Sequence, residues 1–419
     1  MAHPASAIIA AMNRLVASSI DQIRPESLPP ARDRGDRAAP GNAAPARLLF
    51  ITAFALGFKT LSGQLEAFTA SRDDVDAVHL KLRLDGSLRW LGAGLHRLSG
   101  WDLVGSRTQV AWKVLLDRLF RGPVDPARFD AVLVSTQGLG LAMPGIRARY
   151  GLPYGVYIDT TTSLFCRELG GHAIPETIAN IGERHVYRGA DFVAGMSRWS
   201  LNSVRDDYGI DPARLVVVHN AVPIPPAAPT PAPRTPGQKP RIVIVGNDWV
   251  RKGGPRLLAW HQARWTDRAE LHVISSTAPV DRSAKGVIWH GSVPYATLQR
   301  ELLPSMDIFA LPTRRDMSPW AAIEAAGLGL PVVSSRIGAL GEIVLDGRTG
   351  LLCRPDADSE YIAAIERLIA DPPLRASMSA AARQHMLDEF SPGDNYGRLI
   401  DRMKAVAGPS TTRPAASPQ

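Results

Sequence analysis

The chain has 419 residues, of which 45% are hydrophobic, and it carries a formal net charge of +8. Its two cysteines, Cys166 and Cys353, lie far apart, which argues against a disulfide framework and against a cysteine-rich metal site. No apolar stretch reaches the roughly 18 residues of a membrane span. The scattered arginines form no aromatic-interleaved basic block that would predict nucleic-acid binding.

Residues 1–46 are expected to be a disordered extension outside the main fold, because most of them are rich in Pro, Arg, Asp and Ala. A set of apolar residues near the start is spaced to line one face of a short helix: Ile8, Ile9, Met12, Leu15, Val16 and Ile20. A secretory signal would need a basic start and a longer apolar core, and this segment has neither. We therefore expect a cytoplasmic protein, with weak peripheral contact to the inner face of a membrane as an option.

Residues 47–222 predict a first domain of alternating strands and helices. Its short apolar runs are RLLFITAF, DAVHLKLR, DAVLVS (130–135), YGVYID (154–159), DFVAG and LVVVHN (215–220). Such alternation is typical of a parallel sheet covered by helices.

The segment 223–240, PIPPAAPTPAPRTPGQKP, predicts an extended linker, because proline fits neither a helix interior nor a central strand. A second domain is expected over 241–406, and its last helix is free to pack back on the first domain. The strand patterns of this domain are RIVIVG (241–246), ELHVIS, GVIWHG, DIFALP (307–312) and PVVSS (331–335). Residues 407–419 predict a disordered tail.

These patterns predict an α/β protein with two doubly wound, Rossmann-like domains that face a cleft. In such sheets ligands bind at the carboxyl ends of the strands, where the strand order reverses. The loops that follow the strands are therefore where a functional site is expected.

The stretch 315–324, RDMSPWAAIE, places a carboxylate on each side of a Ser-Pro step. Ser318 suits an N-cap and Pro319 a first helical residue, so Asp316 precedes a helix and Glu324 lies about two turns along it. The helix N-terminus between the two acids favours a phosphate. A nucleotide-sugar, with its phosphates between two hydroxyl-bearing rings, fits this arrangement. The alternative is an ordinary capped helix with two surface acids.

A second loop, VGNDWVRKGG (245–254), follows the strand at 241–246. Gly246 lets the chain turn, and Arg251 and Lys252 precede the next helix. Arg binds phosphate bidentately and Lys adds a point charge, so both suit an anion. The alternative is a solvated basic turn. A third loop, in 334–352, brings backbone N–H groups around Gly338 to the same edge of the sheet.

Together these stretches resemble the retaining glycosyltransferases of family 4, which have the GT-B fold. The resemblance covers nearly all of 241–390 and touches the first domain at 183–222. The family pattern is an acid, seven residues, Glu, and then A-x-G-x-P-V. Here it reads as Asp316, seven residues, Glu324 and AAGLGLPVV.

The resemblance implies a role for each of these residues. Glu324 would hold the nucleotide ribose, Asp316 would meet the hexose, and Arg251 and Lys252 would bind the diphosphate. Gly246, Ser318 and Gly338 would line the same donor site. The catalytic residues would thus be Asp316, Glu324, Lys252 and Arg251. After hinge closure, the enzyme would transfer a hexose to a glycan, lipid or small-molecule acceptor with retention of configuration. No cofactor is expected to stay bound, because the nucleotide-sugar is a co-substrate.

The chain departs from the family pattern in three places. The first acid is usually Glu, and here it is the shorter Asp316. The family's first-domain His-Asp reads Ile158-Asp159, so Asp159, Thr160 and Thr161 are expected on the acceptor side. The stretch GFKTLSGQ (57–64), with Gly63, resembles the family's acceptor-side glycine loop but is poor in glycine.

Three other functions are open from the residues alone. A dinucleotide enzyme would use STQGLGLAMPG after the strand at 130–135, with Asp159 about 20 residues later, but Met143 stands at the third glycine position. A metal-dependent transferase would use an Asp-x-Asp pair, either Asp74/Asp76 or Asp356/Asp358; neither has local support, so we expect no catalytic metal. A non-catalytic GT-B protein that binds a nucleotide or a sugar is the third.

Overall fold

The computed structural model describes residues 44–53, 56–82, 103–169, 176–225, 238–279, 281 and 283–408. The predicted N-terminal helix, nearly all of the extension, most of the Pro-rich linker and the tail from 409 lie outside these residues. Contacts divide the chain into two compact units. Among the described residues, the first unit holds those up to Met196, Ser200–Val218 and those from Tyr396 on, and the second unit holds Ser197–Trp199 and those between His219 and Asn395.

The first unit is built on a six-stranded parallel sheet with the order β2-β1-β3-β4-β5-β6. Its strands are β1 (Ala46–Ala53), β2 (Val75–Leu82), β3 (Ala131–Ser135), β4 (Tyr154–Ile158), β5 (Phe192–Gly195) and β6 (Leu215–Val217). The connecting helices are α2 (Leu56–Ala70), α5 (Leu103–Arg121), α6 (Gln137–Gly140), α7 (Met143–Tyr150), α8 (Thr162–Glu168), α9 (Glu176–Gly189) and α10 (Arg198–Asp206), with short 3-10 turns at η2 (Pro126–Arg128) and η3 (Pro212–Arg214).

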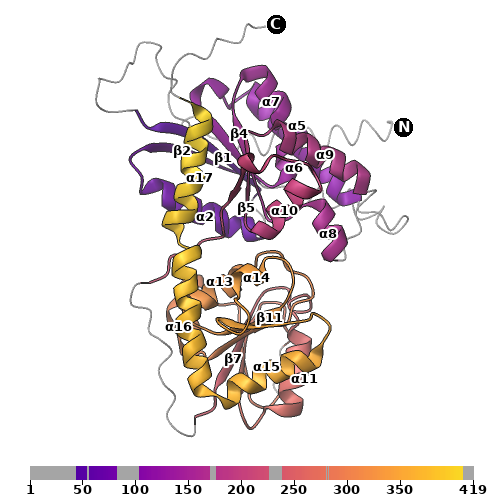
Figure 1. Cartoon of the computed structure of the whole chain (residues 1–419), viewed down its shortest axis with the longest axis vertical. Helices are drawn as coiled ribbons and strands as arrows, with labels where there is room; N and C mark the ends of the chain where they lie inside the picture. The colour runs from indigo at the N-terminus through magenta and orange to yellow at the C-terminus, as the bar shows by residue number, and fades with distance from the viewer. Residues whose placement is uncertain are drawn as a thin grey trace. The chain divides into compact units, whose positions relative to one another are not determined.

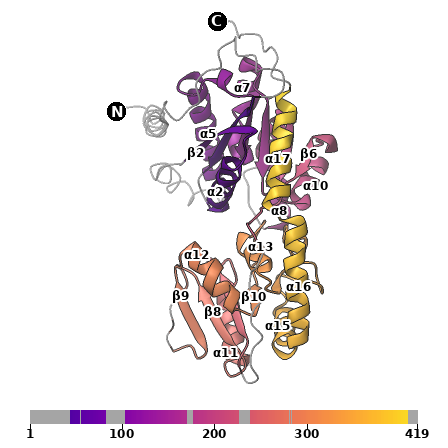
Figure 2. The same cartoon turned by 90° about the vertical axis from the view of Figure 1, so that its left-hand side faces the viewer.

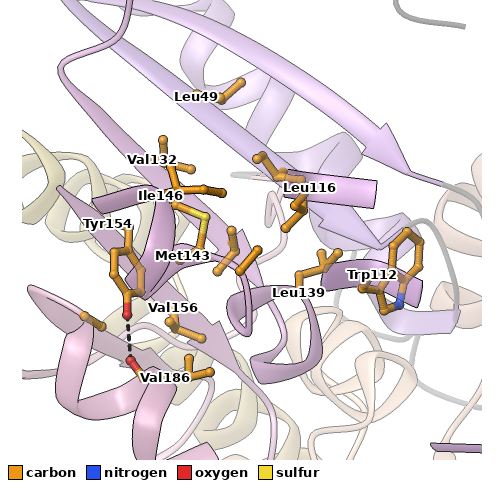
Figure 3. Close-up of a cluster of buried hydrophobic side chains, with 14 of the residues drawn as sticks. Leu49, Trp112, Leu116, Val132, Leu139, Met143, Ile146, Tyr154, Val156 and Val186 are labelled. Carbon is orange, nitrogen blue, oxygen red and sulfur yellow. Dashed lines mark hydrogen bonds between the residues drawn. The ribbon is translucent and has the colours of Figure 1, made fainter. Parts of the chain in front are cut away.

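The central strands of this sheet carry apolar side chains at nearly every position, because helices cover both faces of a parallel sheet. Figure 3 shows one part of the resulting core, where Leu116 of α5, Leu139 of α6 and Ile146 of α7 lie over strand residues such as Val132. Tyr154 is fully buried there, and its hydroxyl donates to the Val186 carbonyl at 2.8 Å. This bond satisfies the one polar atom that the tyrosine carries into the core.

The last helix of the described chain, α17 (Pro392–Ala407), packs on the first unit from Tyr396 on. Arg398 Nη1 donates to the Val217 carbonyl at 2.8 Å, and Lys404 Nζ lies 2.6 Å from Asp74 Oδ2. In Figure 1 this helix runs alongside the sheet of the first unit.

The second unit has a second six-stranded parallel sheet, with the order β12-β11-β10-β7-β8-β9. Its strands are β7 (Arg241–Val245), β8 (Glu270–Ile274), β9 (Val287–Gly291), β10 (Ile308–Leu311), β11 (Val332–Ser335) and β12 (Gly350–Cys353). Its helical elements are α11 (Gly254–Arg264), α12 (Tyr295–Thr297), the π-helical turn η4 (Leu298–Leu302), the 3-10 turn η5 (Leu303–Ser305), α13 (Trp320–Gly327), α14 (Leu340–Ile343), α15 (Asp358–Ala370) and α16 (Pro372–Glu389).

Two apolar layers enclose this second sheet. Helices α11 and α15 pack on one face through residues such as Trp260 and Ile365 (Figure 1). Helices α13 and α16 and the segment that starts at α12 pack on the other, through residues such as Ile323, Met386 and Leu298. Figure 2 shows α12 beside the strands β8 and β9. The prediction of two doubly wound α/β domains is confirmed, and no helix among the described residues is long and apolar enough to cross a membrane.

Candidate functional site

The strand order of the second sheet reverses between β7 and β10, which are neighbours at its centre. The first strand of the unit, β7, has β8 on one side and β10 on the other, so the connections leave in opposite directions from this pair. The loops after the two strands therefore diverge at their carboxyl ends, where doubly wound sheets bind ligands. These are the loops that carry Arg251, Lys252 and Asp316.

The side chains of Lys252 and Asp316 meet between these loops. Lys252 Nζ lies 2.5 Å from Asp316 Oδ2, and Arg251 Nη1 lies 3.4 Å from the same oxygen. The Lys252 and Asp316 side chains are 12% and 9% exposed, so this pair is largely shielded from water. Arg251 also pairs with Asp248 at 2.7 Å. The cluster therefore balances two cations against two acids, and an anionic ligand would compete with Asp316 and Asp248 for the two cations.

Two glycines allow the loop after β7 to take this course. Gly253 has a φ of +81°, and a Cβ added there would lie 2.0 Å from the Pro312 carbonyl oxygen. A Cβ added at Gly246 would lie 2.9 Å from Lys252 Cγ, so the lysine stem rests against the Gly246 backbone. Glycine is required at 253 both for the left-handed backbone and for the close approach to β10.

Backbone and side-chain hydrogen bonds join the two loops. Thr313 Oγ1 donates to the Arg251 carbonyl at 3.0 Å, and Arg251 Nη1 donates to the Arg315 carbonyl at 2.8 Å. Arg256, in the first turn of α11, donates to the Pro312 carbonyl at 3.2 Å. The relative position of Lys252 and Asp316 is thus fixed by their backbones as well as by their ion pair.

The loop after β11 lies against the same place. Gly338 has a φ of +54°, and a Cβ there would lie 2.5 Å from the Asp316 carbonyl oxygen. The Ala339 N–H donates to the Met317 carbonyl at 2.8 Å. Gly338 therefore lies against the backbone of the Asp316 loop. It belongs to the third loop that the sequence predicts for this site, within 334–352.

Glu324 lies on α13 and is 6% exposed, which rules out the alternative of a surface acid. Burial raises the pKa of its carboxyl to about 7, and the facing Tyr295 hydroxyl and Gln299 amide oppose that rise. The same burial, together with the nearby acid, raises the pKa of Tyr295 above its usual range. A buried acid that titrates near neutrality is typical of a functional site.

The start of α13 differs from the prediction by one residue. The helix begins at Trp320, with Pro319 as the N-cap residue in an extended conformation at ψ 113°, so the expected N-cap role of Ser318 is wrong. The Pro319 carbonyl accepts the first helical hydrogen bond, from Ala322 at 3.1 Å. Ser318 Oγ instead faces Asn220, whose Nδ2 lies 3.3 Å away.

In the first unit, Asp159 and Thr160 follow β4 directly, at the carboxyl edge of the sheet. The Thr160 carbonyl accepts from Gln137 Nε2 at 3.2 Å, and the same amide donates to Glu183 at 2.9 Å. Glu183 is buried and accepts from the Thr162 N–H at 3.1 Å, so it fixes the start of α8. Burial raises the pKa of Glu183, against the effect of these hydrogen bonds.

The sequence also carried a signal for Glu183 that our reading missed. Apolar residues follow it at helical spacing, Val186 and Tyr187, which places the acid on the buried face of α9.

The prediction of a glycine loop at 57–64 is wrong, because these residues lie within α2. Leu61 and Leu65 are fully buried at a spacing of four residues, which favours an amphipathic helix over a loop. Gly63 lies on the exposed side of that helix, and a Cβ added there would meet nothing within 4 Å. Gly63 is therefore not part of a loop that closes on a ligand.

The residues that suggested a dinucleotide enzyme or a metal-dependent transferase have structural roles. Met143, at the third glycine position of the dinucleotide pattern, is fully buried in the core of the first unit (Figure 3). Asp358 pairs with Arg256 at 2.5 Å, and Asp74 pairs with Arg72 at 2.7 Å. Within the described part of the chain, no group of three or more His, Cys, Asp or Glu side chains is placed to hold a metal ion. A metal-independent reaction stays a prediction.

Two family models match the chain, one in each unit. The model described as "Glycosyl transferases group 1" matches residues 239–371, and the one described as "Glycosyl transferase 4-like domain" matches residues 59–221. The first match contains all of the Arg251, Lys252, Asp316 and Glu324 positions.

Among curated proteins, the chain is 27% identical over 251 residues to the alpha-maltose-1-phosphate synthase of Mycolicibacterium smegmatis. That alignment covers 53% of this chain and 64% of the relative, so the chain matches somewhat less than two thirds of that relative's length. A D-inositol 3-phosphate glycosyltransferase of Geodermatophilus obscurus is 28% identical over 265 residues, which are 57% of each chain.

Among solved structures, sucrose-phosphate synthase from Thermosynechococcus elongatus matches with a TM-score of 0.65 at 16% identity. The match covers 86% of this chain and 99% of that one. The Anabaena protein HepE in complex with UDP-glucose matches with a TM-score of 0.59 at 15% identity, over 86% of this chain and 99% of that one. Likenesses at this level of identity establish the fold.

Proposed function

We propose that this chain, which belongs to the group 1 (family 4) glycosyltransferases of GT-B fold, transfers a hexose from a nucleotide-sugar to an acceptor. The observation that carries the proposal is the cluster of Arg251, Lys252 and Asp316 at the strand-order reversal of the second sheet, with the buried Glu324 on the following helix. A diphosphate needs the cations, and the sugar rings on either side of it need hydroxyl acceptors.

Each donor-site residue of the second unit has one proposed role in binding the nucleotide-sugar. The diphosphate binds Lys252 and Arg251 and the N–H groups at the start of α13, where the helix dipole favours an anion. Asp316, relieved of part of its pairing with Lys252, accepts hydrogen bonds from the hexose hydroxyls. The ionised Glu324 accepts from the ribose hydroxyls. The backbone at Gly246, which lies against the Lys252 stem, and at Gly338, which lies against the Asp316 loop, is proposed to line the same space.

The chemistry proposed is displacement of the nucleoside diphosphate with retention of configuration at the anomeric carbon. The acceptor hydroxyl attacks on the face from which the diphosphate departs, and a phosphate oxygen of the leaving group takes its proton. Lys252, Arg251 and the helix N-terminus stabilise the charge that develops on that leaving group. No side chain acts as a nucleophile in this scheme, and Asp159 and Thr160 are proposed for the acceptor side.

Binding and transfer need separate tests, because a GT-B protein without transferase activity would also hold a nucleotide. Thermal unfolding with uridine, guanosine, adenosine and thymidine diphosphates identifies the nucleotide, since a ligand that binds only the folded state raises the melting temperature. Uridine diphosphate comes first because HepE, which has the same fold, has been solved with UDP-glucose. Matching nucleotide-sugars are then assayed for hydrolysis and for transfer to a panel of glycans, lipids and small alcohols.

Nuclear magnetic resonance of the product gives the anomeric configuration. An α-linked product from an α-linked donor supports retention, and a β-linked product refutes it. Binding without hydrolysis or transfer for every donor would leave the chain as a nucleotide-binding protein.

A further inference from the structure

A relay of buried hydroxyl groups, made of Tyr361, Ser335 and Thr313, runs from α15 to the loop after β10. The Tyr361 hydroxyl donates to Ser335 Oγ at 2.6 Å, and Ser335 Oγ donates to the Thr313 carbonyl. All three residues are fully buried. A carbonyl can only accept, so Ser335 gives its one proton to Thr313 and must receive the proton of Tyr361. The hydrogen bonds of the hydroxyl relay therefore run in one direction only.

The Thr313 side chain extends the hydroxyl relay into the candidate donor site. Its Oγ1 donates to the Arg251 carbonyl at 3.0 Å and accepts from the Arg315 N–H at 3.3 Å. Thr313 thus joins the loop after β7 to the loop after β10, three residues before Asp316. Because Ser335 holds its carbonyl and its own hydroxyl holds Arg251, a shift of Thr313 would move both loops.

A second set of contacts from α15 ends on the neighbouring residue, Pro312. Asp358 lies three residues before Tyr361, on the same face of α15, and its Oδ1 is 2.5 Å from Arg256 Nη2. Arg256 donates to the Pro312 carbonyl at 3.2 Å, and its guanidinium lies 5.2 Å from the centre of the Tyr361 ring, where a cation is attracted to the ring. Both sets of contacts start on one face of α15 and end just after β10.

We propose that Tyr361 is a positioning residue for the donor nucleotide, which acts through Ser335 and Thr313 on the two loops of the candidate site. This inference rests on the proposed function, since it needs a nucleotide at those loops. Tyr361 has no exposed surface, so it does not touch the ligand itself. Its hydroxyl keeps the relay in one arrangement, so that the diphosphate meets loops that are already in place and loses less affinity to their ordering.

The test compares Tyr361→Phe with the wild type by calorimetry, with the tightest binder among uridine, guanosine, adenosine and thymidine diphosphates. The variant keeps the ring that lies against Arg256 and loses only the hydroxyl. Ser335 then lacks its donor and is free to turn away from the Thr313 carbonyl, so nucleotide affinity should fall by about three- to tenfold. The melting temperature should fall as well, since a buried hydrogen bond is lost.

Tyr154→Phe is the matched control. Tyr154 is also fully buried, and its hydroxyl donates to a backbone carbonyl of the first unit at 2.8 Å. Both substitutions remove one buried hydroxyl and should lower the melting temperature to a similar extent. Tyr154→Phe should leave nucleotide affinity unchanged, so a fall in affinity that is confined to Tyr361→Phe does not come from lower stability alone.

Ser335→Ala tests the route by which Tyr361 acts. It removes the middle hydroxyl of the relay, so it should lower nucleotide affinity at least as much as Tyr361→Phe does. In Ser335→Ala/Tyr361→Phe the second change should add nothing to the loss of affinity, because the route is already interrupted. Losses of affinity that multiply in the double variant would show that the two hydroxyls act independently, and would overturn the relay.

The failure of this inference differs from the failure of the proposed function. If the wild type binds none of the four nucleotides, both fall. If the wild type binds one of them and Tyr361→Phe lowers only the melting temperature, the tyrosine is a structural residue and only the inference falls. Should Tyr361→Phe not fold, the nucleotide affinity of Ser335→Ala decides in the same way, and an unchanged value refutes the inference.

Discussion

Lys252 Nζ lies 2.5 Å from Asp316 Oδ2, so the lysine expected to bind the donor diphosphate is paired, in the free protein, with the acid expected to bind the donor sugar. Pairing satisfies both charges at a place that is largely shielded from water, where an unpaired charge would be costly. It also means that a diphosphate competes with Asp316 for Lys252. Binding of the donor would then leave the acid with an acceptor oxygen to offer to a hydroxyl.

Replacement of Lys252 should therefore reduce activity strongly. We expect Lys252→Ala to lower kcat/KM by well over tenfold, because the leaving diphosphate loses its buried cation. Lys252→Met should have a similar effect on rate while it keeps the stem that lies against Gly246. Lys285→Met, an exposed lysine of the same unit, is the control and should be near normal. Near-normal turnover of both Lys252 variants would remove this residue from the site.

The same ion pair makes a prediction for stability. Lys252→Met leaves Asp316 with Arg251 as its nearest cation, at 3.4 Å. We expect a loss of about 1 to 3 kcal/mol in the free energy of unfolding, measured with urea, and a recovery of much of it in Lys252→Met/Asp316→Asn. A double variant that is less stable than either single variant would show that the pair does not couple in this way.

Glu324 should impose opposite pH dependences on stability and on donor affinity. Its folded pKa of about 7 lies above the ordinary value of 4.5, so between these values the folded state holds a proton that the unfolded state has lost. The contribution of this group to stability is present below about pH 4.5 and is lost as the pH rises through about 7, up to about 3 kcal/mol in all. Donor affinity, which needs the ionised acid, rises over the upper part of this range.

Glu324→Gln is the control for both effects. It cannot titrate, so the part of the pH dependence of stability that comes from this site should disappear, as measured by urea unfolding between about pH 4.5 and about pH 7.5. Turnover should fall by well over tenfold. The carboxylate offers the ribose hydroxyls two acceptor oxygens, whereas the amide offers one acceptor oxygen and one donor group. A variant that transfers sugar at the wild-type rate would exclude Glu324 from donor binding.

Gly253→Ala should damage the donor site more than a glycine substitution in an open turn. At Gly347, φ is +76° and a new Cβ would meet nothing within 4 Å, so Gly347→Ala should cost only the left-handed strain, about 1 kcal/mol. At Gly253 the strain is similar, but the Cβ would also meet the Pro312 carbonyl at 2.0 Å. We expect a larger loss of stability and a weaker nucleotide affinity at 253. Equal effects at the two positions would contradict the close approach.

The sequence was sufficient for those features that depend on local pattern and on the rules of parallel sheets. Runs such as RIVIV and IFAL predict buried strands, and the order in which strands alternate with helices predicts the doubly wound sheet. That topology brings the loops of Lys252 and Asp316 together, although neither loop alone identifies its partner. The expected glycine loop at 57–64 was wrong because two leucines, Leu61 and Leu65, favour a helix more strongly than Gly63 opposes it.

What the sequence could not predict depends on packing between distant segments. The pairing of Asp316 with Lys252, in place of a free acid, requires side-chain positions that spacing does not supply. The burial of Glu324 depends on how distant segments pack around α13, among them the segment after β9 that carries Leu298, and PYATLQ contains no pattern that indicates it. The helix start at Trp320 instead of Pro319 depends on one ψ angle, which lies within the usual uncertainty of helix ends.

The pairing of β7 with β10 joins two parts of the chain that are distant in sequence, since 64 residues separate Lys252 from Asp316. Contacts of this range form late in folding, because the intervening chain must close into a large loop before they are gained. The binding site for an anion is therefore absent from any intermediate in which β7 and β10 have not yet paired. During refolding, the return of nucleotide binding would report the completion of the central sheet, and no isolated peptide from either loop would acquire the site.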